Sequence, residues 1–196
     1  MAVEKSAAVF LDRDGTLVRD VGYLRRPEEL EILPRAAEAL ARLRQGGLKI
    51  VVVTNQSGIA RGLLSEQRLA AIHALLVERL AAGGATVDGI YYCPHHPTEG
   101  VGAYRRACDC RKPNTGLVRR ATEELAIEPR ASYVVGDQSV DMELAGRVGA
   151  KGVWIDGRTG PRVGPAPRCS YVATDLWDAA QWVIEDLESR VSGSRP

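Results

Sequence analysis

The stretch Ala7-Ala8-Val9-Phe10-Leu11-Asp12-Arg13-Asp14-Gly15-Thr16 decides the fold, because an apolar run stops abruptly at two carboxylates. A run without polar alternation is typical of a strand that is buried on both faces of a parallel sheet. Ligands of open α/β sheets bind outside the carboxyl ends of such strands, so Asp12 and Asp14 should lie at the functional edge. Two acids this close favour a shared divalent cation. The alternative interpretation is a strand that ends in an ordinary acidic turn.

Two later runs repeat this pattern of a buried strand followed by polar residues. Residues 48–53 lead into Thr54-Asn55-Gln56-Ser57-Gly58, and residues 132–136 lead into Asp137-Gln138-Ser139-Val140-Asp141. Further strands are expected at 89–92 and 151–155, with a possible last strand at 171–173. Helical spacing of apolar residues predicts helices over 34–46, 65–80, 115–126, 141–148 and 176–187. His73 lies on the apolar stripe of the second helix, and we interpret it as a packed or surface histidine.

Strands that alternate with helices predict a three-layer α/β/α, Rossmann-like parallel sheet. We expect a single domain over residues 1–191, a Gly/Pro-rich loop over 157–167 and a flexible tail over 192–196. About forty residues separate Asp14 from Thr54, which leaves no room for a large cap domain. The site should therefore be open.

The composition excludes several classes of protein. The 196 residues are 45% hydrophobic and 5% aromatic, with a net charge of +1. No basic block or aromatic platform suggests a nucleic-acid partner, and no apolar segment reaches the length of a membrane-spanning helix. The first residues lack the apolar core of a signal peptide, so we expect a cytoplasmic protein, and we expect a monomer.

A metal-binding loop is the most specific local signal in the sequence. Cys93 and His95 precede a Gly-containing segment, and Cys108 and Cys110 follow it. Two close pairs of such ligands suit tetrahedral Zn²⁺ in a closed structural site. His96 is the rival for the histidine position, but the Cys-x-His spacing mirrors Cys-x-Cys and favours His95. A set of surface thiols is the alternative, and the distant Cys169 is expected to be a non-ligand.

The motifs together resemble the haloacid-dehalogenase-like phosphatases. They are Asp12-x-Asp14-Gly15-Thr16, Thr54, Lys112 and Gly136-Asp137-x-x-x-Asp141, in that order. The resemblance implies that Asp12 is the nucleophile, Asp14 the general acid and base, and Thr54 and Lys112 the phosphoryl-binding groups. It also implies Mg²⁺ held by Asp12, the Asp14 main-chain carbonyl and Asp137, with Asp141 supporting the loop.

Within this family, three stretches resemble a group that contains heptose bisphosphate phosphatases, with histidinol-phosphate phosphatases as near relatives. The stretches are residues 54–62, 91–97 and 108–113. The group implies removal of the 7-phosphate of D-glycero-D-manno-heptose 1,7-bisphosphate, on the way to nucleotide-activated heptose for lipopolysaccharide or other surface glycans. Histidinol phosphate hydrolysis and an inactive zinc-stabilised binding module are the alternatives.

The same resemblance implies where a small sugar phosphate would bind. Arg111 is expected to offer a bidentate contact to a second anionic group of the substrate. Gln138 departs from the lysine that relatives can carry, and it can still donate a hydrogen bond. The expected substrate contacts are Arg13, Asp20, Gly22, Tyr23, Asn55, Gln56, Ser57, Arg61, Arg111 and Gln138.

Overall fold

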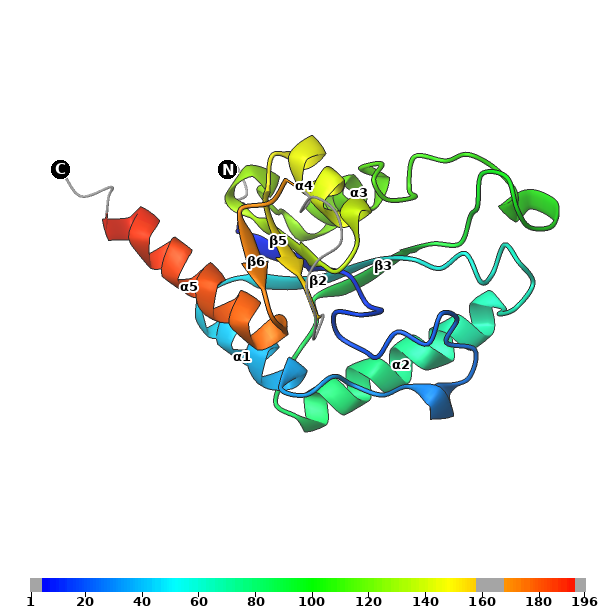
Figure 1. Cartoon of the computed structure of the whole chain (residues 1–196), viewed down its shortest axis with the longest axis horizontal. Helices are drawn as coiled ribbons and strands as arrows, with labels where there is room; N and C mark the ends of the chain where they lie inside the picture. Colours follow the sequence, from blue (N-terminus) through cyan, green and yellow to red (C-terminus); the bar gives the residue numbers. More distant parts are fainter. Residues whose placement is uncertain (1–4, 158–167, 193–196) are drawn as a thin grey trace.

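A computed structural model describes residues 5–157 and 168–192 of the chain. Within these ranges, six strands form one sheet in the order β3-β2-β1-β4-β5-β6, and all neighbouring strands are parallel. This arrangement confirms the predicted parallel sheet, including its last strand (Figure 1). The strands are β1 (Ala8–Leu11), β2 (Lys49–Asn55), β3 (Gly89–Cys93), β4 (Tyr133–Gly136), β5 (Lys151–Ile155) and β6 (Tyr171–Ala173).

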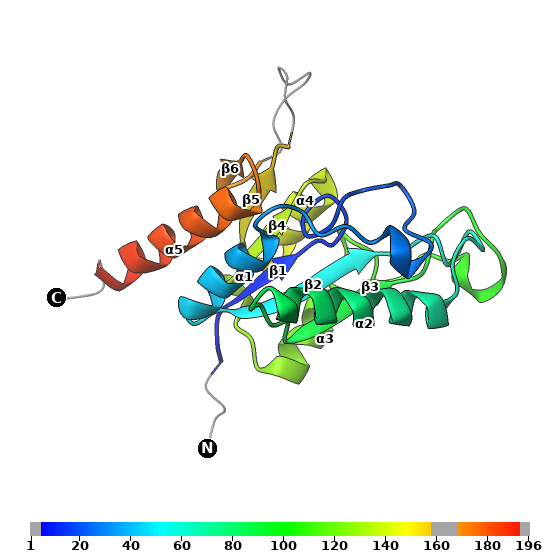
Figure 2. The same ribbon diagram turned by 90° about the horizontal axis from the view of Figure 1, so that it is seen from below.

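Helices cover both faces of the sheet and make the predicted three layers (Figures 1 and 2). In β1, Val9 and Leu11 belong to a core shared with α1, α2 and α5, whereas Ala8 and Phe10 pack with α3 and α4. Every residue of a doubly covered strand is buried, which is why the run could be all apolar. The helices are α1 (Ala36–Gln45), α2 (Glu66–Ala82), α3 (Gly116–Leu125), α4 (Ser139–Val148) and α5 (Leu176–Ser192), with short 3-10 turns at Pro27–Glu29, Gly102–Tyr104 and Pro129–Ala131.

The strand order reverses beside β1, and this reversal places the site. From β1 the chain adds β2 and β3 on one side, then crosses back so that β4, β5 and β6 extend the other side. The connections that leave β1 and β4 therefore diverge, and a crevice forms at the carboxyl ends of these two strands. Asp12 and Asp137 are the residues that directly follow them.

Helix α4 begins at Ser139, two residues before the predicted start at Asp141. The Asp141 carboxylate accepts a hydrogen bond from the Gln138 main-chain N–H at 3.2 Å, so this acid caps the first turn from inside the helix. An acid three residues after the N-cap is a frequent capping arrangement. The expected boundary was wrong because Asp141 is a capping residue of the first turn and does not open the helix.

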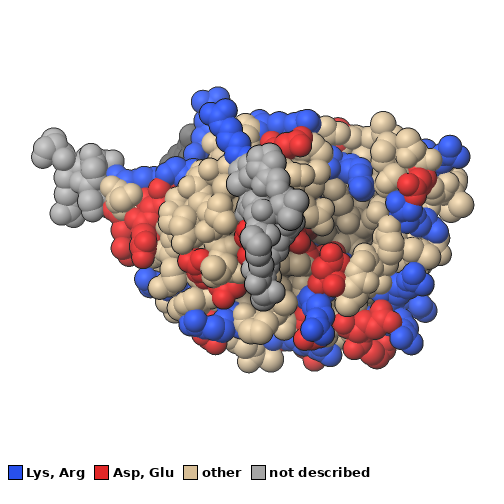
Figure 3. Space-filling model, viewed as in Figure 1, with Lys and Arg blue, Asp and Glu red and all other residues tan. Residues whose placement is uncertain are grey.

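Two predicted segments are only partly described. Helix α5 extends to Ser192, the first residue of the predicted tail, and residues 193–196 lie outside the described part of the chain. The same holds for 158–167 of the predicted loop. Among the described helices, none combines the length and apolar character that a membrane span requires. On the face drawn in Figure 3, acidic and basic side chains are interspersed, in keeping with the net charge of +1.

Candidate active site and metal-binding cluster

The carboxyl ends of β1, β2 and β4 bring three predicted site residues to one edge. Asp12 follows β1, Thr54 is the penultimate residue of β2, and Asp137 follows β4. The ladder between β1 and β4 continues past the strand ends, since the Asp12 N–H donates to the Val135 carbonyl at 3.0 Å. Residues that are distant in the chain are thus held together by sheet register.

A cavity of about 270 Å³ opens at this edge of the sheet. Thr54 lies just behind its wall, buried, and accepts a hydrogen bond from Gln56 Nε2 at 2.9 Å. Arg61 is not part of the wall, and it forms an ion pair with Glu99. The residues lining the cavity are Asp12, Arg13, Asp14, Asp20, Gly22, Tyr23, Leu24, Asn55, Gln56, Ser57, Gly58, Arg111, Lys112 and Gln138.

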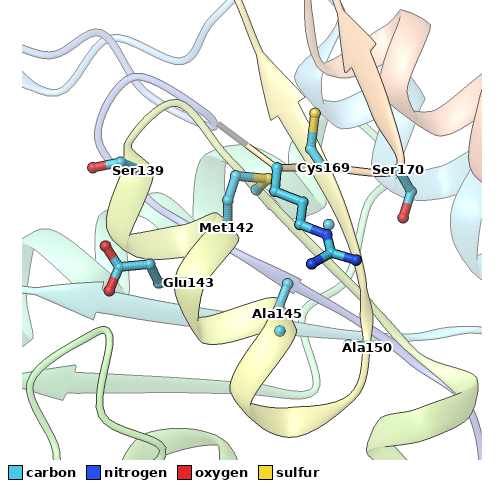
Figure 4. A pocket seen from close by; sticks show the side chains of 10 residues that line it. Ser139, Met142, Glu143, Ala145, Ala150, Cys169 and Ser170 are labelled. Atoms are coloured by element: carbon cyan, nitrogen blue, oxygen red, sulfur yellow. The ribbon is translucent and has the colours of Figure 1, made fainter. Parts of the chain in front are cut away.

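A larger cavity, of about 600 Å³, lies on the α4 side of the sheet (Figure 4). Its wall includes Met142 and Glu143 of α4 and Cys169 and Ser170, which precede β6. None of its lining residues is an acid of the strand ends, and Cys169 belongs to neither group of potential metal ligands among the described residues. The candidate chemistry therefore belongs to the smaller cavity.

Three carboxylates and one ammonium group form a buried cluster at this edge of the sheet, and two of its members, Asp12 and Lys112, line the smaller cavity. Asp12, Asp137 and Asp141 each offer an oxygen, and these oxygens lie within 4.8 Å of one another. Lys112 Nζ lies 2.9 Å from Asp12 Oδ1 and 2.7 Å from Asp141 Oδ1. Burial opposes the charge of Lys112, but the two carboxylates outweigh it and raise the pKa of this ammonium. The cation therefore stays charged at physiological pH.

The acid cluster fits a divalent cation. Burial raises the pKa of Asp137 to about 7, and the nearby carboxylates of Asp12 and Asp141 add to the shift. Asp137 Oδ1 is buried and has no hydrogen-bond partner in the described part of the chain. An unpaired, buried carboxylate oxygen is costly, and a hard cation such as Mg²⁺ would give it the missing partner.

Gly15 allows Asp137, which directly follows β4, to approach the loop after β1. This residue has a φ of +75°, and a Cβ at its position would lie 2.2 Å from Asp137 Oδ2. Any side chain would therefore displace the carboxylate as well as strain the backbone. The glycine of the Asp14-Gly15-Thr16 motif is explained by this contact.

Asp14 points to a different set of partners from Asp12. Its carboxylate accepts hydrogen bonds from Arg13 Nη2 at 2.9 Å and from Gln56 Nε2 at 2.8 Å. The two acids are one residue apart in sequence, yet Asp14 is not a member of the three-carboxylate cluster. Asp12 faces the lysine and Asp14 faces the arginine, so the two carboxylates have different environments.

Two predicted substrate contacts have partners within the protein. Asn55 Nδ2 donates to the Lys112 carbonyl at 3.2 Å, and the Lys112 N–H donates to Asn55 Oδ1 at 3.0 Å. This pair of bonds fixes the main chain of the lysine against the end of β2. Arg111 Nη1 donates to the His95 carbonyl at 3.1 Å and still lines the cavity.

Cys93, His95, Cys108 and Cys110 come together as a compact cluster in which one atom of each lies within 4.8 Å of the others. The sulfur–sulfur distances are 3.2 to 3.5 Å, and His95 Nδ1 lies 3.3 Å from Cys110 Sγ. Ligands of a tetrahedral zinc site are about 3.8 Å apart when the Zn–S bond is about 2.3 Å. The donor set and its compactness fit such an ion.

His96 lies outside this cluster. Its Nδ1 accepts a hydrogen bond from the Glu99 N–H at 3.0 Å, so the histidine in the cluster is His95. All four cysteines of the chain are free of disulfides. Because Arg111 binds the His95 carbonyl, the cluster is connected directly to the cavity wall.

We expect Asp137→Asn to raise the melting temperature of metal-free protein at pH 8. The folded pKa of about 7 exceeds the ordinary value of about 3.9, so the folded state retains a proton that the unfolded state has lost. Stability from this group is therefore full below pH 4 and is lost as the pH rises through 7. The amide carries no charge and removes that loss. Thermal unfolding at pH 5.5 and pH 8 measures the effect.

Magnesium provides the second half of this experiment. Added Mg²⁺ should raise the melting temperature of the wild type at pH 8 and leave Asp137→Asn unchanged. Glu143→Gln, an exposed carboxylate-to-amide change on α4, is the control and should respond to Mg²⁺ like the wild type. An Asp137→Asn protein that is still stabilised by Mg²⁺ would contradict the assignment of this ligand.

Comparison with known proteins agrees with this geometry. A family model described as HAD-hydrolase-like matches residues 109–179. D-glycero-beta-D-manno-heptose-1,7-bisphosphate 7-phosphatase of Pasteurella multocida (strain Pm70) is 49% identical over 144 residues, which is 74% of this chain and 77% of the relative. The enzyme of the same name from Escherichia coli (strain K12) is 40% identical over 182 residues, which is 92% of this chain and 89% of the relative.

Solved structures give the same result. A D,D-heptose 1,7-bisphosphate phosphatase from B. bronchiseptica, complexed with magnesium and phosphate, has a TM-score of 0.79 and 33% identity over 92% of this chain and 99% of that one. A HAD-like phosphatase structure from Mesorhizobium loti has a TM-score of 0.81 and 34% identity, covering 94% of this chain and 88% of that one. Fold, site and relatives together define an enzyme of the phosphatase class. The chain belongs to the family of HAD-like hydrolases.

The sequence interpretation missed two features of the site. One is the ion pair of Lys112 with Asp141. The motif after Gly136 singled out Asp141, but it did not indicate which residue this acid contacts. The other is His73, whose ring nitrogen Nε2 lies 3.2 Å from Arg13 Nη1. A single histidine on an apolar helix stripe carries no sign of what it faces, so this contact could not have been read from the sequence.

Proposed function

We propose that the protein is a Mg²⁺-dependent phosphatase that removes the 7-phosphate of D-glycero-D-manno-heptose 1,7-bisphosphate in the cytoplasm. Relatives at 40% to 49% identity are named for this activity. The observation that supports the proposal most directly is the Lys112 ammonium 2.9 Å from Asp12 at the floor of an open polar cavity. A nucleophilic carboxylate needs such a cation nearby to meet a phosphate dianion.

The reaction in this proposal has two steps. An Asp12 oxygen attacks phosphorus, the bond from phosphorus to the sugar oxygen breaks, and that oxygen takes a proton from Asp14. A water molecule then attacks the phosphorus of the aspartyl phosphate and gives a proton to Asp14, while phosphate leaves and the Asp12 carboxylate is restored. Asp14 thus acts first as acid and then as base.

Other residues at this edge of the sheet would stabilise charge. Lys112 and Thr54 would bind oxygens of the transferred group, while Asp141 holds the ammonium in place. Bound Mg²⁺, held by Asp12, Asp137 and the Asp14 main-chain carbonyl, would screen the nucleophile and the phosphate from each other. Lys112 cannot replace the metal, because it already balances two carboxylates.

We propose that Arg111 binds the second phosphate of the substrate, the one that is not transferred. It lines the cavity from the cluster loop, and its side chain is anchored by the His95 carbonyl. Arg111→Ala should reduce kcat/KM for the heptose bisphosphate by about 10- to 150-fold, the cost of a lost charge-assisted hydrogen bond. The loss should be much smaller for the heptose 7-monophosphate. Steady-state kinetics with purified protein measure both.

Two comparisons complete this test of the function. Wild-type protein that prefers histidinol phosphate to the heptose bisphosphate would refute the proposed substrate. Equal losses on both heptose substrates would place Arg111 at the reacting phosphate instead. Arg119→Ala, an exposed arginine paired with Asp109 outside the cavity, is the control and should keep wild-type values.

We also propose that the cysteine–histidine cluster holds one structural Zn²⁺. Cys108→Ser should release the ion, loosen the loop that carries Arg111 and lower both activity and thermal stability. Elemental analysis of protein purified without chelator should find about one zinc per chain in the wild type. Cys169→Ser, a thiol outside the cluster, should keep the zinc. Fully active wild-type protein without zinc would contradict this proposal.

A further inference from the structure

Helix α2 carries a polar ring within an otherwise apolar face. His73 is buried, like its neighbours Leu69, Ile72 and Leu76 on the same helix. Its Nε2 lies 3.2 Å from Arg13 Nη1, and its ring packs edge-on against Tyr92 at a centroid distance of 5.8 Å. A leucine would fill such a position without the cost of burying a polar group. Unlike a leucine, the histidine can make the polar contact with Arg13.

The direction of this hydrogen bond follows from chemistry. A guanidinium group has donors and no acceptor, so His73 Nε2 must accept and the proton of the neutral ring must be on Nδ1. Burial, followed by the charge of Arg13, lowers the pKa of His73 to about 3. The ring is therefore neutral, and thus able to accept, at any pH at which the enzyme would work.

The other side-chain nitrogens of Arg13, Nε and Nη2, donate hydrogen bonds to residues at the carboxyl edge of the sheet. Its side chain is 1% exposed. Nη2 donates to both oxygens of Asp14 at 2.9 Å and to Gln56 Oε1 at 2.9 Å, and Nε donates to Asp14 Oδ1 at 3.2 Å. Gln56 Nε2 in turn donates to Asp14 Oδ2 and Thr54 Oγ1. The guanidinium fork is thus pinned between His73 on one side and Asp14 on the other.

We propose that His73 is a positioning residue, which orients Arg13 and through it the proton-transferring carboxylate of Asp14. The inference rests on the acid–base role given to Asp14 in the proposed function. It also gives Arg13 a role other than the substrate contact expected from the sequence. Without the acceptor, Nη1 would be buried and unpaired, and the fork would shift to find a partner.

The leaving group of the substrate separates this role from a purely structural one. Departure of a sugar oxygen needs a proton from Asp14, whereas p-nitrophenolate leaves without one. The variants are His73→Leu, which removes the acceptor, His73→Gln, which keeps one, and Leu76→Ala, which makes a cavity on the same buried face of α2 and leaves the His73 acceptor in place. Rapid-quench kinetics on the heptose bisphosphate and on p-nitrophenyl phosphate would resolve the first turnover of each.

His73→Leu should slow the first turnover of the heptose bisphosphate by about tenfold or more, with KM near the wild-type value. Its first turnover of p-nitrophenyl phosphate should stay near the wild-type rate, followed by slow hydrolysis of the aspartyl phosphate, for which Asp14 is the base. His73→Gln should recover most of the lost rate. Leu76→Ala should lose stability and keep its rate per folded molecule.

Two outcomes would overturn the inference. One is an equal first-turnover loss on both substrates in His73→Leu, and the other is a His73→Gln variant as slow as His73→Leu. The ratio of the first-turnover rates on the two substrates is measured on one preparation. An unfolded fraction of a variant would lower both signals equally and leave this ratio unchanged. If wild-type protein ignored the heptose bisphosphate, the proposed substrate would fail, and the delayed hydrolysis after the p-nitrophenol burst would still test His73.

Discussion

Asp12→Asn should lower kcat for phosphomonoester hydrolysis by at least about a thousandfold, because it removes the nucleophile of a covalent mechanism. The amide has nearly the same shape as the carboxylate but cannot attack phosphorus. Lys112 would keep its partner Asp141 at 2.7 Å, so the cavity floor should hold its structure. The variant should therefore fold like the wild type, with the melting temperature and circular dichroism of an intact sheet.

The measurement is steady-state turnover with Mg²⁺, combined with an acid quench after incubation with labelled substrate. The wild type should yield a labelled protein and Asp12→Asn should not, and EDTA should abolish turnover. Glu31→Gln, an exposed acid-to-amide change in a surface ion pair, is the control and should keep both activity and label. Phosphoprotein formation by Asp12→Asn would exclude Asp12 as the nucleophile.

Lys112→Met removes the ammonium that lies between two buried carboxylates, and we expect a loss of both stability and activity. Breaking a buried ion pair from one side typically costs about 3–5 kcal/mol, because the remaining charge has no partner. Removing one group that stabilises transition-state charge typically costs about 10²–10³ in kcat. Both losses follow from the contacts at 2.9 Å to Asp12 and 2.7 Å to Asp141.

A double variant separates the two effects. Lys112→Met combined with Asp141→Asn removes one of the two unpaired charges, so chemical denaturation should show part of the stability restored. Turnover should stay low, since the phosphate would still lack its cation. A single Lys112→Met protein with near wild-type stability and turnover would show that the ammonium has neither role.

The fold was largely readable from the sequence because strand burial and turn chemistry are local properties. The apolar run before Asp12 predicts a doubly covered strand, and the run that ends at Thr54 predicts its neighbour. The parallel sheet confirms both. The start of α4 was misplaced because a capping contact between Gln138 and Asp141 depends on a side-chain direction that spacing does not reveal.

Residue types and spacing by themselves determined the αβα fold, the residues at the strand ends and the two close Cys/His pairs that form one cluster. Only the tertiary structure decided which of these groups face one another. In it, Asp12 contacts Lys112 whereas Asp14 contacts Arg13. Lys112 also forms an ion pair with Asp141, and His73 contacts Arg13. The physical reason is that the apolar pattern of a strand or helix is a property of residues close together in the chain. Hydrogen bonds and ion pairs instead depend on the angstrom-scale placement of distant segments that the sheet brings together.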